Sequence, residues 1–411
     1  MSITAGRTGA LTGIGAVMLV LIGGCSAIEA EPEVEVVRIA ADLELSGDLS
    51  HLGTVYRNAL ELRVEQVNEQ DLLRSNRRLE LVVRDNRSDA AVASANLNDF
   101  ANDPSFTAIV SGACWRCLES ALDLLGDSGI PTISLAAPDA VVFPVDERRN
   151  VFKLGPNAQH VADALMAEVA KAVPAQDGTL ALITTDDEYG QDGVDAIVNA
   201  AGHYDINIVI NQRVAGDGGG VLTVVQEIAS YAPEEAPGQF GQTEPGQTGP
   251  NAVVIWGLGN ATAEVAASLR EVGYSGPLFL DPSAAYDLFT GSESNVLNGA
   301  TMIFVEALVI DEVIATSPAK AARKNWFNSY TARYGTYHAP SSFAADAINI
   351  IVDAINQVDT TDRGALRNSL ESLQGDGFTG PLRMTPENHS GVLPQGLVAV
   401  TVRGDRWRLS G

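Results

Sequence analysis

The sequence predicts an α/β protein of two similar lobes that face each other across a cleft, and three observations lead to this fold class. Segments rich in β-branched residues alternate with segments of helical periodicity, in steps of roughly 25 to 30 residues, as in parallel sheets covered on both faces. The alternation starts at Val34 and starts again after residues 151–159. With 411 residues, 45% of them hydrophobic, the chain is long enough for two cores.

The first run of elements begins with the strand-like stretch VEVVRIAADLEL, which is rich in β-branched residues. A helix follows, with Val55, Ala59 and Leu62 on one face. The run continues with the strand LELVVRD, a helix over residues 88–102, the strand TAIVSG, a helix after Cys114 and the strand IPTISL. This succession predicts a parallel sheet with helices on both faces.

The second run repeats this design. It comprises GTLALITT running into a helix start at DDEYGQDG, the strand DINIVINQRV, a strand and helix in AVVIWGLGNATAEV, and the strand GPLFLDPS. Ligands of open α/β sheets bind beyond the carboxyl ends of the strands, so two facing lobes imply a cleft. The insert at residues 232–250 has four prolines and four glycines and is expected to be a mobile exposed loop in lobe two.

Two helices are expected after these runs, at residues 318–334 and 342–358, and strands joined by turns at the end of the chain. Helical spacing puts Ala345, Ile348 and Ile355 on one apolar face of the second helix, which indicates a core contact. Asp346 lies in the same helix and faces either the cleft or the solvent. We favour the solvent.

The N-terminus has the layout of a secretory signal: Arg7, an apolar stretch and small residues. The sequence LIGGC ending at Cys25 resembles the bacterial lipobox, in which the cysteine becomes the lipid-modified first residue of the mature protein. An ordinary signal peptide with a chance cysteine is the alternative. We expect a lipoprotein signal peptide over residues 1–24, an acidic tether over residues 25–33 and a protein outside the cytoplasm, anchored to a bacterial membrane.

Charge and composition argue against several classes of partner. The net charge of −26 disfavours nucleic acid, because phosphate contacts are made by lysine and arginine. None of the five histidines lies at ligand spacing from another, so we expect no metal site. The sequence has no Gly-x-Ser-x-Gly elbow and no complete phosphate-binding glycine motif. We therefore expect no cofactor.

The loops at the strand ends resemble those of a known protein family. They are LELSGDLSHLG, RDNRSDAAVA, GIPTISLAAP, VFKLGPNAQH, TTDDEYGQDG, REVGYSGPLFLDPS and FTGPLRM. In this order they resemble the Leu/Ile/Val-binding proteins of bacterial ABC importers, which have the type I periplasmic binding protein fold. The resemblance implies two Rossmann-like lobes joined by a three-stranded hinge, with a central ligand cleft that closes on a small solute.

The resemblance also implies domain boundaries and binding residues. The crossovers would lie near residues 154–157, 283–285 and 376–379. Lobe one would comprise residues 34–155 and 285–376, and lobe two residues 156–284 and 377–411. Ligand contacts in lobe one would come from Ser46, Leu52, Ala113, Trp115, Arg116, Ala136 and Ala137. Those in lobe two would come from Tyr189, Gly257, Leu258, Asp281 and Ser283.

The sequence departs from the amino-acid-binding relatives at two positions. Trp115 stands where they often have a serine for the ligand carboxylate, although backbone N–H groups after Cys114 could hold that group at a helix start. Ser283 stands where they have an acid for the ligand ammonium. Either Asp281 takes the place of that acid or the ligand carries no ammonium, because a buried ammonium needs a partner.

Cys114 and Cys117 form a Cys-x-x-Cys pair, which by itself fits a redox centre, half a zinc site, a staple or part of a ligand pocket. In the amino-acid-binding relatives a cysteine at the Cys114 position pairs with one that is matched here by Arg87. Two thiols this close tend to be oxidised outside the cytoplasm, and acylation removes Cys25 as a partner. We expect a local disulfide between Cys114 and Cys117 at the rim of the ligand loop.

Three side chains near these loops each have two interpretations. Trp115 is either an aromatic wall of the pocket or a ring packed between helix and loop. Arg116 either pairs with a ligand carboxylate or is a solvated surface residue, which we favour. Tyr189 either contacts the ligand, which we favour, or holds a turn.

The resemblance and the signal sequence together predict an extracytoplasmic substrate-binding lipoprotein of an ABC importer. It would be a monomer without enzymatic activity that captures a small polar solute, an amino acid or a related amide, and delivers it to the permease. The alternative is a ligand-sensing receptor component of the same fold, which the end of the chain at Gly411 without a second membrane span disfavours. A thiol oxidoreductase acting through Cys114 and Cys117 is a third interpretation.

Overall fold

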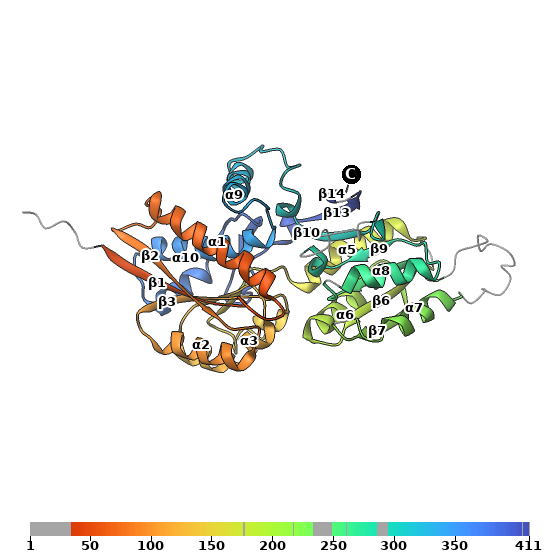
Figure 1. Cartoon of the computed structure of the whole chain (residues 1–411), viewed down its shortest axis with the longest axis horizontal. Coiled ribbons are helices and arrows are strands. Elements are labelled where there is room, and N and C mark those ends of the chain that lie inside the picture. The colour runs from red at the N-terminus through yellow and green to blue at the C-terminus, as the bar shows by residue number, and fades with distance from the viewer. Residues whose placement is uncertain are drawn as a thin grey trace, which may run out of the picture.

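The computed structural model describes residues 34–232, 249–285 and 295–410, apart from Gln176, Asp217, Asn260 and Asp405. Two α/β lobes lie side by side along the long axis of the molecule, each built on a sheet with helices on both faces (Figure 1). This architecture confirms the predicted fold class. The predicted signal sequence, Cys25, the acidic tether and most of the insert at residues 232–250 lie outside the described residues.

The sheet of lobe one is entirely parallel, with the strand order β2-β1-β3-β4-β5. Its strands are β1 (Glu35–Leu43), β2 (Arg77–Asp85), β3 (Phe106–Ser111), β4 (Thr132–Ser134) and β5 (Val151–Lys153). In the register of β1, Ile39 lies opposite Leu81 on one side and Ala108 on the other. Because β1 is central and covered on both faces, it is buried from Ile39 to its end.

Helices cover both faces of this sheet. On one face, α1 (Ser50–Glu69) and α10 (Pro340–Val358) lie against each other, with α9 (Pro318–Tyr334) beyond them (Figure 1). On the other face lie α2 (Ala90–Asn102), α3 (Trp115–Glu119) and α4 (Leu122–Ser128). The helix α11 (Arg363–Leu370) packs against α10. The helix α2 begins where the Asp89 side chain accepts hydrogen bonds from the Ala91 and Val92 N–H groups, a typical N-cap.

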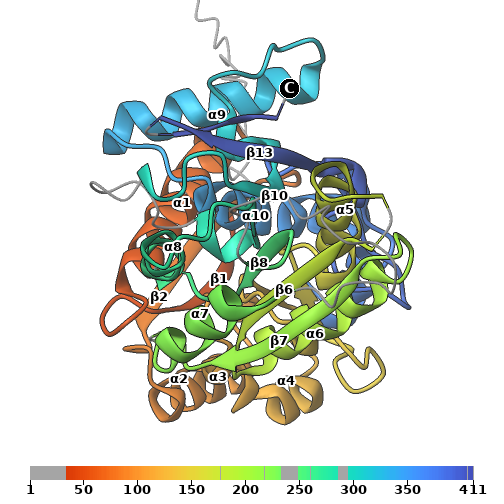
Figure 2. The same cartoon turned by 90° about the vertical axis from the view of Figure 1, so that its right-hand side faces the viewer.

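Lobe two repeats the design. Five parallel strands lie in the order β7-β6-β8-β9-β10, which matches lobe one, and two antiparallel strands extend the β10 edge. These strands are β6 (Thr179–Thr185), β7 (Asn207–Val214), β8 (Ala252–Trp256), β9 (Leu278–Leu280), β10 (Thr301–Val305), β13 (Leu397–Arg403) and β14 (Arg406–Leu409). One face packs on α5 (Ala158–Ala172) and α6 (Glu188–Ala201), and the other on α7 (Val221–Ser230) and α8 (Ala261–Glu271) (Figure 2).

The chain crosses between the lobes three times, and one of the three predicted crossovers coincides with the structure. Residues 154–157 connect β5 to α5, as expected. The second crossing follows Val305, because β10 pairs with β9 and β13 in the sheet of lobe two. The prediction of residues 283–285 was wrong, because the strand TMIFV that forms β10 went unrecognised.

The third crossing also comes later than predicted. A hairpin of β11 (Gln374–Asp376) and β12 (Pro381–Arg383) precedes it. The chain then pairs with the end of β5: Lys153 N–H donates to the His389 carbonyl and Gly391 N–H to the Lys153 carbonyl, at 2.9 and 2.8 Å. Residues 377–392 therefore stay with lobe one, and the crossing lies between Val392 and Leu397.

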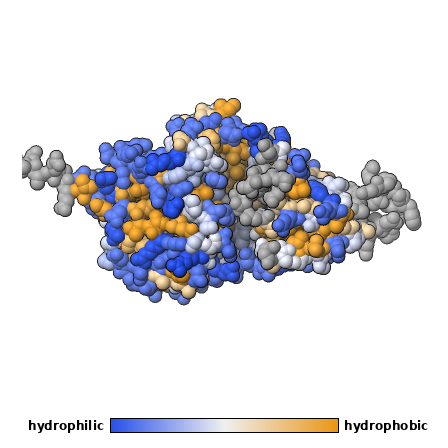
Figure 3. Space-filling view, viewed as in Figure 1, coloured by the Kyte–Doolittle hydropathy of each residue, from blue (hydrophilic) through white to orange (hydrophobic). Residues whose placement is uncertain are grey.

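The surface is mixed in character. Hydrophilic residues cover much of the face shown in Figure 3, and hydrophobic patches interrupt them on both lobes. In the part of the chain that the structure describes, no helix has the length and apolar character that a membrane span requires.

Candidate functional site

A pocket lies between the two lobes, at the carboxyl ends of both sheets. Its lining comes from lobe one, the first crossover and lobe two: Tyr56, Leu135, Ala137, Gly155, Pro156, Ala158, Val161, Tyr189, Trp256, Pro282, Ser283 and Phe343. Ligands of open α/β sheets bind at this end of the strands. We therefore take this pocket as the candidate ligand site.

Four aromatic rings contribute to the lining. Tyr56 comes from α1 and Phe343 from α10 in lobe one, whereas Tyr189 from α6 and Trp256 from the end of β8 belong to lobe two. The Trp256 indole N–H donates to the Tyr189 carbonyl at 3.1 Å, and the two ring centroids are 5.7 Å apart. Gly193 of α6 allows this packing, because a Cβ there would lie 2.5 Å from the indole ring.

Asp281 holds the lobe-two side of the pocket together. It follows β9 and is fully buried. Its Oδ1 accepts from Gly257 N–H at 2.9 Å and Ser283 Oγ at 2.8 Å, and its Oδ2 accepts from Tyr189 Oη at 2.8 Å and Ser283 N–H at 2.9 Å. Burial raises the pKa of Asp281, and these hydrogen bonds act against the rise. The carboxylate thus fixes Tyr189 and Ser283 where they line the pocket.

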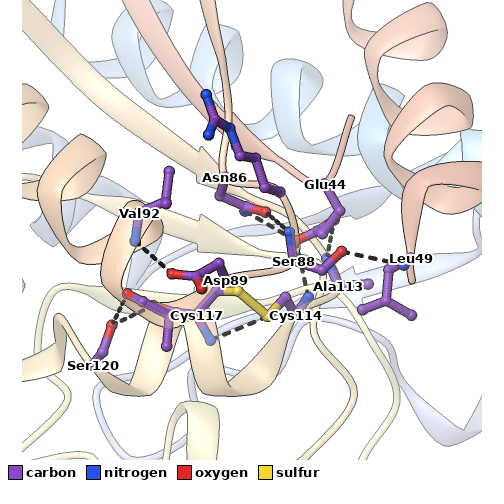
Figure 4. Close-up of a disulfide and its surroundings, with 12 residues drawn as sticks. Glu44, Leu49, Asn86, Ser88, Asp89, Val92, Ala113, Cys114, Cys117 and Ser120 are labelled. Carbon is purple, nitrogen blue, oxygen red and sulfur yellow. Dashed lines mark hydrogen bonds between the residues drawn. A yellow bond between two sulfur atoms is a disulfide. The ribbon is translucent and has the colours of Figure 1, made fainter. Parts of the chain in front are cut away.

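Lobe one also holds a buried acid, Glu44 (Figure 4). It follows β1, is 1% exposed, and accepts from Cys114 N–H at 3.0 Å, Ala113 N–H at 3.2 Å and Asn86 Nδ2 at 3.3 Å. Burial raises its pKa. These two backbone groups lie just before α3, so the donors to Glu44 differ from the N–H groups after Cys114 that the sequence suggested for a ligand carboxylate. Gly112 leaves room for it, because a Cβ there would lie 2.3 Å from Glu44 Oε2.

A second buried acid supports Glu44. Asp42 is fully buried and accepts from Asn86 Nδ2 at 2.9 Å and Asn96 Nδ2 at 2.8 Å. Burial, with Glu44 as a weaker contribution, raises the pKa of Asp42 to about 7. We call Asp42, Glu44 and Asn86 the lobe-one carboxylate cluster, and Asp281, Tyr189 and Ser283 the lobe-two carboxylate cluster.

A third polar group joins the lobes at the first crossover. Lys153 at the end of β5 is fully buried, and its Nζ donates to the Ala137 carbonyl at 3.0 Å and to the Asp139 carboxylate. Asp139 in turn accepts from Ala158 N–H at the start of α5 at 3.1 Å. Its own N–H donates to Asp192 of α6 at 2.7 Å, and burial raises the pKa of Asp192 to about 6. Asp139 therefore bonds to two helices of the opposite lobe.

Asp346 lies in the interior, which corrects the expectation that it faces solvent. It is fully buried in α10 and accepts from Phe378 N–H at 2.8 Å, Thr379 N–H at 2.9 Å and Thr379 Oγ1 at 2.7 Å. Gly377 has no room for a Cβ, which would lie 2.4 Å from the Asp346 carboxylate. The acid thus fixes the loop between β11 and β12.

Cys114 and Cys117 are joined by a disulfide in the structure (Figure 4). Cys114 is the N-cap of α3, and its sulfur accepts from the Cys117 N–H at 3.2 Å. The two cysteines are 7% and 1% exposed. The bond lies under the loop that donates to Glu44, on the lobe-one side of the molecule.

The structure brings some of the predicted binding residues to the pocket. Ala137, Tyr189 and Ser283 line it, Asp281 is one hydrogen bond away from Ser283, and Gly257 in turn donates to Asp281. Leu52, Leu258 and Ala136 are core residues.

Others lie outside the lining. Ser46 is exposed and donates to Asp85 at 2.7 Å, and Ala113 donates to Glu44. Trp115 is half-buried against the lobe-one core, and Arg116 is exposed.

Three lining residues, Tyr56, Phe343 and Trp256, and the buried acid Glu44 were not predicted from the sequence. Tyr56 and Phe343 lie on helices whose apolar faces are typical of core packing, and both side chains are at most 5% exposed. Trp256 ends an apolar strand, so only its position at the strand's carboxyl end could have marked it. Within the described ranges, no group of three or more histidine, cysteine, aspartate or glutamate residues is arranged to hold a metal ion.

A family model described as periplasmic binding protein matches residues 36–405. The chain belongs to this family. Among solved structures, an extracellular ligand-binding receptor from Rhodopseudomonas palustris HaA2 has a TM-score of 0.76 at 20% identity, covering 92% of this chain and 100% of its own. The match confirms the type I periplasmic binding protein assignment made from the loops.

Two further similar structures were determined with a ligand. An ABC transporter substrate-binding protein from Desulfitobacterium hafniense in complex with Leu has a TM-score of 0.70 at 18% identity, covering 92% of this chain and 100% of its own. A solute-binding protein of an ABC transporter from Rhodopseudomonas palustris BisB5, in complex with 3,4-dihydroxy benzoic acid, has 0.73 at 14%, covering 91% and 96%. None of the curated proteins matches the sequence significantly. At these identities the likeness establishes the fold.

Proposed function

We propose that this periplasmic binding protein is the extracytoplasmic substrate-binding component of an ABC importer. The observation that carries the proposal is the aromatic pocket between the lobes, to which lobe one, the first crossover and lobe two all contribute. A solute there contacts both lobes and so favours the closed arrangement of the hinge. Binding and release complete the cycle without any bond being broken, and the protein is not an enzyme.

The remaining parts of the proposal concern the environment of the protein. Cys25 is lipid-modified and anchors the protein as a monomer to a bacterial membrane, from where it delivers the solute to the permease. The solute is small, and an amino acid or a related amide is the class expected from the family. The disulfide between Cys114 and Cys117 forms in the exported protein. A Cys25→Ser variant that stayed on the membrane would argue against the anchor.

The two alternative functions differ in what they require. A ligand-sensing receptor component would use the same pocket and would bind its solute without promoting transport. A thiol oxidoreductase needs an accessible thiolate, whereas Cys114 and Cys117 are 7% and 1% exposed. The buried pair favours a structural bond. Insulin reduction by the purified protein would revive the oxidoreductase.

A thermal-shift screen of the mature protein tests the proposal. The compounds are amino acids, their amides, amines, short carboxylates, sugars and nucleosides. A ligand at one hundred times its dissociation constant stabilises the folded state by about 2.7 kcal/mol. We expect at least one saturable shift that is lost in an Ala137→Trp variant, whose indole fills the pocket. Absence of any shift across the screen would contradict a solute-binding function.

A further inference from the structure

We infer that the pocket selects solutes that carry neither an ammonium nor a carboxylate group, such as amides of branched aliphatic or aromatic acids. The inference rests on the proposed solute-binding function and narrows its substrate class. It follows from three features of the described residues: the chemistry of the lining, the saturation of Asp281 in lobe two, and the occupation of two backbone N–H donors in lobe one by Glu44.

The part of the lining that the structure describes is uncharged. Its described residues are four aromatic side chains, two branched aliphatic ones, alanine, glycine and proline residues, and Ser283. Such a surface gains from burying apolar area and rings, and it offers no ionic partner to a charged group. A charged group that loses its water there without a partner binds poorly, because desolvation is not repaid.

Asp281, the acid that could have bound a ligand ammonium, is already fully hydrogen-bonded. Asp281 accepts four hydrogen bonds between 2.8 and 2.9 Å, two at each oxygen. A carboxylate has about four acceptor positions, so these partners saturate it. A ligand ammonium could reach Asp281 only after Tyr189 or Ser283 had moved away. Such a movement would dismantle the lobe-two side of the pocket.

Two backbone donors in the loop just before α3 are occupied as well. The Ala113 and Cys114 N–H groups bind Glu44 at 3.2 and 3.0 Å, and Glu44 is 1% exposed. The lack of a side chain at Gly112 and Gly53 lets Glu44 lie there: a Cβ at Gly53 would be 2.0 Å from the Glu44 carbonyl oxygen. An anion entering this place would have to displace a buried acid or lie against it, and like charges repel.

Isothermal titration with four compounds of one shape tests the inference on the mature protein. They are L-leucine, L-leucinamide, 4-methylpentanoate and 4-methylpentanamide, which differ in the ammonium, the carboxylate or both. The corresponding compounds with a phenyl group form a second set. We expect the uncharged amide of at least one set to bind about tenfold or more tightly than its charged counterparts, as typical for desolvating an unpaired charge.

Each outcome decides the inference. Equal or tighter binding of leucine, phenylalanine or either carboxylate would overturn it and leave the solute-binding function standing. No binding of any member of the sets would also overturn it, and the broader thermal-shift screen then decides the function separately. Binding of the amide should be lost in Ala137→Trp. It should be kept in Ala91→Trp, a control variant at an exposed position on α2. Retention in Ala137→Trp would place the solute elsewhere and contradict the inference.

Discussion

A buried carboxylate follows a central strand in each lobe, but the two carboxylates hold different partners. Glu44 after β1 binds two backbone N–H groups of the disulfide loop and Asn86. Asp281 after β9 binds the side chains of Tyr189 and Ser283, which line the pocket, as well as two backbone N–H groups. Glu44 therefore fixes a loop, whereas Asp281 fixes a loop and two side chains that line the pocket.

The two lobes share a fold but use their buried acids differently. Both lobes use a desolvated acid to satisfy N–H groups of the loops beyond the sheet, as buried polar backbone requires. In lobe two the same acid also orients polar side chains toward the solute. In lobe one the pocket receives Tyr56, Leu135 and Phe343, whose positions come from apolar packing. We expect lobe one to provide apolar contact and lobe two to provide polar orientation.

Asp281→Ala should have the largest effect. It leaves the Gly257 and Ser283 N–H groups buried without their acceptor and frees the Tyr189 ring, so we expect the free energy of unfolding to fall by about 3 kcal/mol. Ligand affinity should fall by about tenfold or more as well, because the hydrogen bonds that orient Tyr189 and Ser283 are lost. Denaturant unfolding and titration calorimetry measure the two effects. Unchanged affinity in a folded variant would separate Asp281 from recognition.

Glu44→Ala should destabilise the protein without a comparable loss of affinity. Two N–H groups lose their acceptor, while the cost of a buried charge is relieved, so we expect a loss of about 2 kcal/mol. Affinity for an uncharged solute should change by less than about threefold, or about 0.7 kcal/mol. Glu44→Gln is the control of matched shape. A large loss of affinity with normal stability would mean that lobe one also recognises the solute through its acid.

The lobe-one carboxylate cluster should also make stability depend on pH, with the smallest effect of the three. The pKa of Asp42 is raised to about 7, so the folded protein takes up a proton that the unfolded chain does not. Stability therefore rises as pH falls from 8 to 6.5, by about 0.8 kcal/mol from this group. Below that range, His160 and His389 oppose the trend, because burial lowers the pKa of each.

Denaturant unfolding at the two pH values measures this dependence, and Asp42→Asn is the control. The variant should lose most of the difference between pH 8 and pH 6.5. If the stability of Asp42→Asn kept the full wild-type dependence on pH, other buried acids would be the titrating groups. Asp281 and Asp346 are candidates, because burial raises the pKa of each.

The order of strands and helices and part of the site could be predicted from the sequence. Alternating strands and helices predicted the two lobes, and the resemblance to the Leu/Ile/Val-binding proteins pointed to Ala137, Tyr189 and Ser283, which line the pocket. Side chains that reach the pocket from long helices were not separable from core residues, because Phe343 is both.

The local sequence pattern could not reveal which buried polar groups hydrogen-bond to one another. Glu44 stands in a loop-like stretch, LELSGDLS, and only the fold brings it under Ala113 and Cys114, some seventy positions away in the chain. The same limit applies to Asp346, whose partners Phe378 and Thr379 come from a distant loop. The strand β10 was missed for a simpler reason, because it is only five residues long.

The most direct test of the account is the affinity of two conservative variants, Asp281→Asn and Glu44→Gln, for the solute that the screen identifies. Each replaces one buried acid with an amide of the same size and leaves the chain otherwise unchanged. We expect Asp281→Asn to weaken binding by about tenfold and Glu44→Gln by less than about threefold. Equal losses, or a larger loss in Glu44→Gln, would contradict the division of work between the lobes.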